Sequence, residues 1–143
     1  MIKLYAAIAL GFALGSIVYA HPATTAAATT SAPIVFFDVA GPDAAALKTF
    51  YAKNFGWTIN GANGITTANL PGTLRQDPPE TLIYLGVSDI DASLKAIVAS
   101  GGSVVVPRTV VPKVATFALF KDPAGNRMGL VEMSPSQNAD RTS

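Results

Sequence analysis

The chain has 143 residues, of which half are hydrophobic and 13% are charged, and its formal net charge is +1. The length favours one domain with a sizeable core, and the lack of a basic run argues against a nucleic-acid partner. There is no cysteine and only one histidine, His21. Disulfides and thiol chemistry are therefore excluded, and a Ser-His-Asp triad or a multi-histidine metal site is hard to build.

The first 20 residues, "MIKLYAAIALGFALGSIVYA", have the pattern of a secretory signal peptide. Lys3 is followed by an apolar stretch that ends in small residues at Ala20. This pattern predicts cleavage after Ala20 and a periplasmic or secreted protein without stable membrane association. The apolar run is slightly shorter than the ~20 residues that cross a bilayer comfortably, and an uncleaved membrane anchor is the alternative.

Composition divides the remaining chain into three parts. Residues 21–32 are rich in Ala and Thr, which predicts a flexible linker. Residues 133–143 are polar and predict a disordered tail. The folded domain is therefore expected at 33–132.

The first half of this domain opens with a β-branched and aromatic run, "PIVFFDVA" at 33–40, which predicts a strand. Asp43 is placed to cap a helix that runs to Phe55, where apolar residues recur at helical spacing. A short strand is expected at 57–60. The stretch 61–80 is rich in turn residues, and it predicts at most one or two weak strands.

The second half follows the same order. A strand at 81–87 precedes a helix that Asp89 caps and Gly101-Gly102 ends. Three more strands are expected at 103–111, 114–120 and 127–132. The helices open with "DAAALK" and "DASLK", which indicates an internal duplication.

This order predicts an α+β fold. Paired β-α-β-β-β modules are expected to form a cupped mixed sheet with the helices outside. The uncovered face of the sheet is then the place for a ligand.

Two stretches resemble the vicinal oxygen chelate superfamily, the glyoxalase/bleomycin resistance/extradiol dioxygenase proteins. "FFDVAGPDAAALKTFYAKNFGW" is similar to that family's first strand, helix and turn, and "GGSVVVPRTVVPKVATFALFKDPAGNRMGLVE" to its closing strands. The resemblance covers 33–132, although 61–80 departs from the pattern and is expected to be short by about one strand. It implies the fold described above, often arranged as a homodimer.

The resemblance also implies a divalent metal, held by His, Glu or Gln side chains from four strands. The positions that match three of these ligands are Phe36, Leu82 and Gly129, and the fourth falls within 61–80. None of the three carries a donor side chain, so we expect an atypical branch without a metal cofactor. Glu132 alternates with Gly129 and should face the other side of the sheet.

Asp38 is the candidate catalytic residue. It shares strand parity with Phe36 and should point into the cleft, where a carboxylate among aromatic side chains could act as a general base. The alternative is a strand-end acid bonded to the backbone or to an arginine.

Six residues are candidates for ligand binding. Tyr84 could stack on a ligand or fill the sheet, and Trp57 could line the cleft mouth or join the core beside the first helix. Arg127, like Arg75 and Arg108, could meet an anionic ligand or be a solvated rim residue. The set is Phe36, Asp38, Trp57, Leu82, Tyr84 and Arg127.

Three functions remain open. The first is an exported, metal-free protein that binds a small apolar or aromatic molecule. The second is an enzyme of this superfamily, a lyase, isomerase or dioxygenase, with a rearranged metal site using Asp77 or Glu80, or with Asp38 as base. The third is a protein-interaction module whose own side chains fill the cleft.

Overall fold

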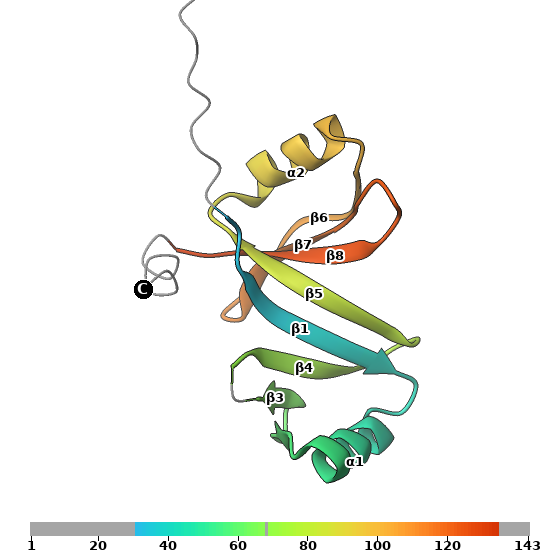
Figure 1. The fold of residues 1–143 in the computed structure, drawn as a ribbon. Helices are drawn as coiled ribbons and strands as arrows, with labels where there is room; N and C mark the ends of the chain where they lie inside the picture. The colour runs from blue at the N-terminus through green and yellow to red at the C-terminus, as the bar shows by residue number, and fades with distance from the viewer. Residues whose placement is uncertain (1–30, 68, 135–143) are drawn as a thin grey trace, which may run out of the picture. The chain divides into compact units, whose positions relative to one another are not determined.

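The computed structural model describes residues 31–67 and 69–134, in which one mixed sheet of eight strands carries two helices (Figure 1). The first half contains β1 (Ile34–Gly41), α1 (Ala44–Phe55), β2 (Thr58–Ile59), β3 (Gly64–Thr66) and β4 (Pro71–Gln76). The second half contains β5 (Glu80–Val87), α2 (Ile90–Ala99), β6 (Ser103–Val111), β7 (Ala115–Lys121) and β8 (Arg127–Glu132). The predicted α+β class is confirmed.

The two halves are built on the same plan. The strand order is β2-β3-β4-β1-β5-β8-β7-β6, with β1 and β5 antiparallel at the centre. Each central strand pairs in parallel with the last strand of its own half, β1 with β4 and β5 with β8. Read outward from the centre, the halves therefore have the same order and are related by an approximate two-fold axis between β1 and β5.

Both helices begin where the sequence predicts. The side chain of Asp43 accepts a hydrogen bond from Ala46 N at 2.9 Å, and Asp89 accepts one from Ala92 N at 2.9 Å. Each cap residue has extended backbone, as an N-cap requires. Gly56 ends α1 at φ 65°, a left-handed conformation that glycine adopts without strain.

The hydrophobic core lies between the helices and one face of the sheet, in two clusters. Under α2 the buried residues are Ile90, Leu94, Ala118, Phe120 and Leu130. Under α1 they are Val39, Ile65 and Leu74, with half-buried side chains around them. The apolar stripes expected on the helices are narrower than predicted, because Phe50, Phe55 and Val98 are 52%, 62% and 53% exposed. The other face of the sheet is left open for a site.

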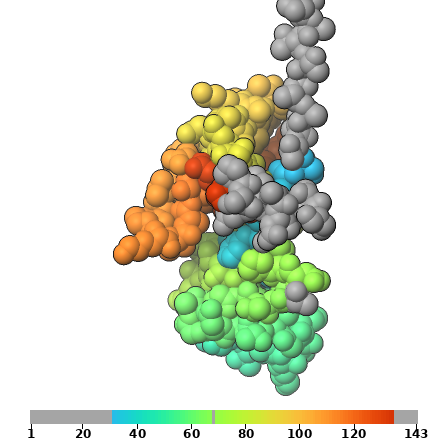
Figure 2. Space-filling model, turned by 90° about the vertical axis from the view of Figure 1, so that its left-hand side faces the viewer, coloured from blue at the N-terminus to red at the C-terminus, as the bar shows by residue number. Residues whose placement is uncertain are grey.

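The expectation that the first half lacks a strand is wrong. The stretch 61–80 contains β3 and β4, and the outer pair β2–β3 is only two and three residues long. Such short strands leave no alternation to read in the sequence. The matching pair in the second half, β6–β7, is nine and seven residues long, and its orange hairpin stands out in Figure 2.

Several expectations concern residues at the chain ends. The signal peptide, most of the linker and all of the tail beyond residue 134 lie outside the described residues. Met133, which was assigned to the tail, is buried, and its N–H donates to Val87 O at 2.8 Å. Within 31–67 and 69–134, neither helix has the length and apolar character needed to cross a membrane.

Candidate functional site

The centre of the open face carries a row of side chains from adjacent strands. Phe36 on β1 lies opposite Tyr84 on β5, Tyr84 lies opposite Gly129 on β8, and Gly129 lies opposite Leu119 on β7. Because side chains alternate along strands, Asp38 and Leu82 share this face in the next row. Asp38 therefore lies on the predicted face, but it is buried against Tyr84 and Arg75 and lines neither of the two cavities described below.

Asp38 is 1% exposed, and both of its oxygens are engaged. Tyr84 donates its hydroxyl hydrogen to Oδ2 at 2.7 Å, and Nη2 of Arg75 donates to Oδ1 at 3.2 Å. Nε of Arg75 lies 3.0 Å from Oδ2, close enough for an ion pair, although its direction does not make a hydrogen bond. This arrangement agrees with the alternative of an acid paired to an arginine, and Asp38 holds the side chains of Arg75 and Tyr84 together.

The Asp38 carboxylate fixes the protonation of its two partners. Burial, the hydrogen bond to Asp38 and the charge of Asp38 together raise the pKa of Tyr84 well above its ordinary value. Burial alone would lower the pKa of Arg75, but the hydrogen bond and charge of Asp38 outweigh it and raise the pKa. Near neutral pH, Tyr84 is therefore a protonated phenol and Arg75 a cation.

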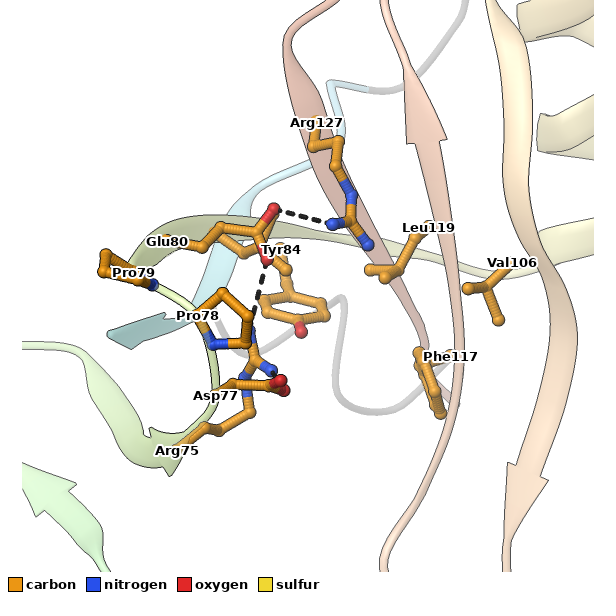
Figure 3. A pocket seen from close by; sticks show the side chains of 11 residues that line it. Arg75, Asp77, Pro78, Pro79, Glu80, Tyr84, Val106, Phe117, Leu119 and Arg127 are labelled. Carbon is orange, nitrogen blue, oxygen red and sulfur yellow. Dashed lines mark hydrogen bonds and ion pairs between the residues drawn. The ribbon is translucent and has the colours of Figure 1, made fainter. Parts of the chain in front are cut away.

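Arg75 also contacts two further carboxylates, Asp77 in the loop between β4 and β5 and Glu80 at the start of β5. Its Nη1 contacts Asp77, and its Nη2 lies 3.4 Å from Glu80. Glu80 in turn pairs with Nη1 of Arg127 at 2.9 Å, as the dashed lines in Figure 3 show. Arg75, Asp77, Glu80 and Arg127, with Asp38 beneath them, form one network that we call the polar wall.

The polar wall borders a cavity of about 570 Å³. Apolar side chains complete the lining, and we call them the apolar wall: Val106, Phe117 and Leu119, which lie across from Arg75 and Asp77 in Figure 3, together with Leu82 on β5. Tyr84 lies between the two walls in Figure 3. The cavity therefore offers charge on one side and a hydrocarbon surface on the other, as many small-molecule sites do.

A second cavity of about 690 Å³ shares Tyr84 and Phe117 with the first. Its other lining residues are mostly apolar and include Phe36, Val111, Val114 and Met133. The ring of Phe36 meets that of Tyr84 edge to face, with 5.7 Å between centroids. The two cavities thus give the open face a polar and an apolar section that meet at Tyr84.

The two-fold relation of the halves locates the fourth metal-ligand position. Phe36 and Leu82 stand at the same distance before their helix caps, so Gly129, paired with Tyr84, corresponds to Thr73, paired with Asp38. The Thr73 hydroxyl donates to Asn63 O at 3.2 Å. A Cβ built on Gly129 would lie 2.1 Å from the Tyr84 ring.

The residues at these four positions, Phe36, Leu82, Thr73 and Gly129, do not fit the divalent-metal site that the resemblance implies. Phe36, Leu82 and Gly129 supply no donor atom, and the ring of Tyr84 occupies the space beside Gly129. Across 31–67 and 69–134, no three His, Cys, Asp or Glu side chains are grouped so that they could hold a metal ion.

The remaining candidates fall in different places. Leu82, Tyr84 and Arg127 line the first cavity, and Phe36 lines the second. Trp57 lies with the core under α1, stacked on Tyr51 at 4.7 Å, which is the structural alternative stated for it. Their roles in binding stay predictions.

Sequence reasoning missed the central place of Arg75 and the whole apolar wall except Leu82. Arg75 is one of the three arginines considered for an anionic ligand. The strands before it are too short to show from the sequence which face of the sheet its side chain lies on. Phe117 alternates with Ala118 on β7, and this alternation was a usable signal. Arg108, the third option, forms two hydrogen bonds with Glu132, at 2.9 and 2.8 Å.

Comparisons with known proteins agree with this geometry. The family model described as the Glyoxalase/Bleomycin resistance protein/Dioxygenase superfamily matches residues 34–130. The anthracycline biosynthesis protein DnrV of Streptomyces peucetius is 27% identical in an alignment 135 positions long, which covers 75% of this chain and 49% of that protein. The Mycobacterium tuberculosis protein CFP32, whose name gives it provisionally as a glyoxylase, is 29% identical over 65% of this chain and 42% of its own length. The chain thus spans about half the length of these relatives.

Solved structures show the same fold. Methylmalonyl-CoA epimerase from Mycobacterium tuberculosis superposes with a TM-score of 0.57 at 15% identity, covering 79% of this chain and 96% of that one. A superfamily member from Vibrio splendidus superposes with a TM-score of 0.53 at 12% identity, covering 72% and 100%. At these identities the likeness concerns the fold alone.

Proposed function

Because the chain belongs to the glyoxalase/bleomycin resistance protein/dioxygenase superfamily, we propose that it binds a small molecule on the open face of its sheet without using a metal ion. The observation that carries this proposal is the set of side chains at the four ligand positions: Phe36, Leu82, Thr73 and Gly129. A metal site needs three or four inward N or O donors, and this set offers one hydroxyl that already donates to a backbone carbonyl.

The lining supports an aromatic or aliphatic body for the ligand. Phe36 and Phe117 present ring surfaces, and Leu82, Val106 and Leu119 present branched hydrocarbon. Apolar surface of this kind gains free energy when a ligand removes it from water. The relationship to a protein named for anthracycline biosynthesis is compatible with an aromatic ligand.

The test is a thermal-shift titration of the full chain with 4-phenylbutan-1-ol, a neutral aromatic probe, in the presence of EDTA. We expect a saturable rise in melting temperature, since a ligand that binds only the folded state stabilises it. Phe117→Ser should weaken the apparent affinity at least tenfold. Phe55→Ser, which changes an exposed aromatic residue outside both cavities, is the matched control. Equal shifts for the two variants would contradict the proposal.

The second candidate function is an enzyme with a rearranged metal site. Asp38, Asp77 and Glu80 all pair with Arg75, and this function would require them to rearrange around a metal ion, since within 31–67 and 69–134 they are not grouped as ligands. In that case Mn, Fe, Ni, Zn or Cu should raise the melting temperature saturably, and Asp38→Ala should abolish the rise. Such a result would replace the metal-independent proposal.

Export remains part of the proposal, on the strength of the signal-peptide pattern at 1–20. Edman sequencing of the protein recovered from the periplasm or medium should begin at His21. An N-terminus at Met1 in the membrane fraction would support the uncleaved anchor instead.

A further inference from the structure

The polar wall has more negative than positive charge. Three carboxylates, Asp38, Asp77 and Glu80, meet two guanidinium groups, Arg75 and Arg127, which leaves a formal charge of minus one. Four of these residues, Arg75, Asp77, Glu80 and Arg127, line the first cavity, and Asp38 is buried behind them in contact with Arg75. Both guanidinium groups are already paired with carboxylates, Arg75 with three and Arg127 with one, so their positive charge is compensated within the wall.

The hydrogen bonds lead to the same conclusion. Arg75 directs Nη1 to Asp77 and Nη2 to Asp38 and Glu80, and Arg127 directs Nη1 to Glu80. Tyr84 lines the cavity and gives its hydroxyl hydrogen to Asp38, so its oxygen can serve a ligand only as an acceptor. Asp77 is about half exposed and keeps free lone pairs. Beside Asp77 and Tyr84 a ligand therefore meets acceptors, because the Nη donors of Arg75 are directed to carboxylates.

We propose, on the basis of the binding function proposed above, that the cleft selects an amphiphilic amine: a protonated amino group bound by Asp77, Glu80 and the Tyr84 oxygen, with an aromatic or aliphatic body along the apolar wall. The ammonium group has three donors and no acceptor, which matches the free lone pairs. Its positive charge balances the polar wall without breaking any of the ion pairs. A carboxylate in the same place would add a second uncompensated negative charge.

The test uses isothermal titration calorimetry of the full chain with three probes that share one body. These are 4-phenylbutylamine, 4-phenylbutan-1-ol and 4-phenylbutyrate, which at pH 7 are a cation, a neutral molecule and an anion. We expect the amine to bind about tenfold more tightly than the alcohol, which corresponds to about 1.4 kcal/mol. The carboxylate should bind most weakly. The preference for the amine should decrease at high salt, because the polar wall is partly exposed.

Two variants locate the preference. Glu80→Gln should remove most of the difference in affinity between the amine and the alcohol, and Asp77→Asn should do the same if Glu80→Gln fails to fold. Asp91→Asn makes the same charge change on α2, outside both cavities, and should have no effect.

The outcomes separate the two proposals. Equal binding of the three probes, or tightest binding of the carboxylate, would overturn the amine inference and leave the binding function in place. If none of the three binds, the binding function itself fails, and the amine inference fails with it.

Discussion

The two halves of the sheet have the same strand order, but they differ in the length of their outer strands, in the size of their cores and in what they contribute to the site. In the first half, β2 and β3 are minimal, the core has three buried residues, and the chain continues into the loop that carries Asp77. In the second half, β6 and β7 are long, the core has five buried residues, and the outer strands form most of the apolar wall. One half and its connecting loop thus supply most of the charge of the site, and the other half most of the hydrocarbon.

The clearest difference lies at the two-fold axis. Asp38 and Tyr84 occupy corresponding places on β1 and β5, each at the same distance before its helix cap. In a perfect repeat they would be the same residue. Because one is an acid and the other a phenol, they form a 2.7 Å hydrogen bond across the axis. This donor–acceptor pair exists because the two halves differ here. Two identical residues related by an exact two-fold axis could not form it.

The largest effect on stability is expected when Asp38, the acceptor of this hydrogen bond, is removed. Asp38→Ala leaves Arg75 and Tyr84 without their shared acceptor, and we expect a loss of about 3 kcal/mol in the free energy of unfolding, as for one partner of a buried ion pair. Urea unfolding measures the change. Asp77→Asn, at an exposed partner of the same arginine, should cost less than about 1 kcal/mol. Similar costs for the two variants would mean that Asp38 does not organise the network.

The cores of the two halves can be compared with matched leucines. Leu130 in the second half and Leu74 in the first are each 2% exposed. Leu130→Ala should cost about 3 kcal/mol and Leu74→Ala about 2 kcal/mol, because the half-buried side chains around Leu74 can collapse into the space. Chemical unfolding of both variants checks the order. The reverse order would show that the smaller cluster is the more rigid one.

A smaller effect is expected at Gly129, the counterpart of Thr73. A methyl group there would meet the Tyr84 ring, so Gly129→Ala should displace the ring and cost about 2 kcal/mol. In a Tyr84→Ala background the same change should cost almost nothing. This double-mutant cycle, measured by urea unfolding, separates the ring contact from any backbone effect of the glycine. An unchanged cost in the Tyr84→Ala background would rule out the ring as the cause.

The sequence predicted most of the fold because its signals are local. Caps at Asp43 and Asp89, helix stops at glycines and β-branched runs set the ends of both helices and of the long strands. The short strand expected at 57–60 is present as β2, and the weak strands expected within 61–80 are β3 and β4, but their bounds could not be predicted, because such short strands are specified by their partners. The exposure of Phe50 and Phe55 was also missed, since helical spacing does not tell how far the sheet extends beneath a helix.

The site was predictable only in part, and for a related reason. Strand parity was enough to place Phe36, Asp38, Leu82 and Tyr84 on the open face. The pairing of Asp38 with Arg75 depends on the parallel register of β1 and β4, which brings together residues 37 positions apart. Registers between distant strands are set by the whole sheet, and single-sequence periodicity carries no information about them.

The smallest expected effect on stability concerns Glu132, which joins β8 to β6 through two hydrogen bonds from Arg108. The residue at the corresponding end of β4 in the first half is Gln76. Glu132→Gln makes the second half resemble the first at this point.

The hydrogen bonds from Arg108 lower the pKa of Glu132, so the folded state holds the carboxylate charged to lower pH than the unfolded state does. This contribution is present above the ordinary glutamate pKa and is lost as pH falls through the lowered value. The stability difference between wild type and Glu132→Gln should therefore be small at pH 7, because the pair is exposed, and should shrink further below about pH 4. Thermal unfolding of both proteins from pH 7 to pH 3 measures it, and a difference that grows toward acid would contradict the assigned pairing.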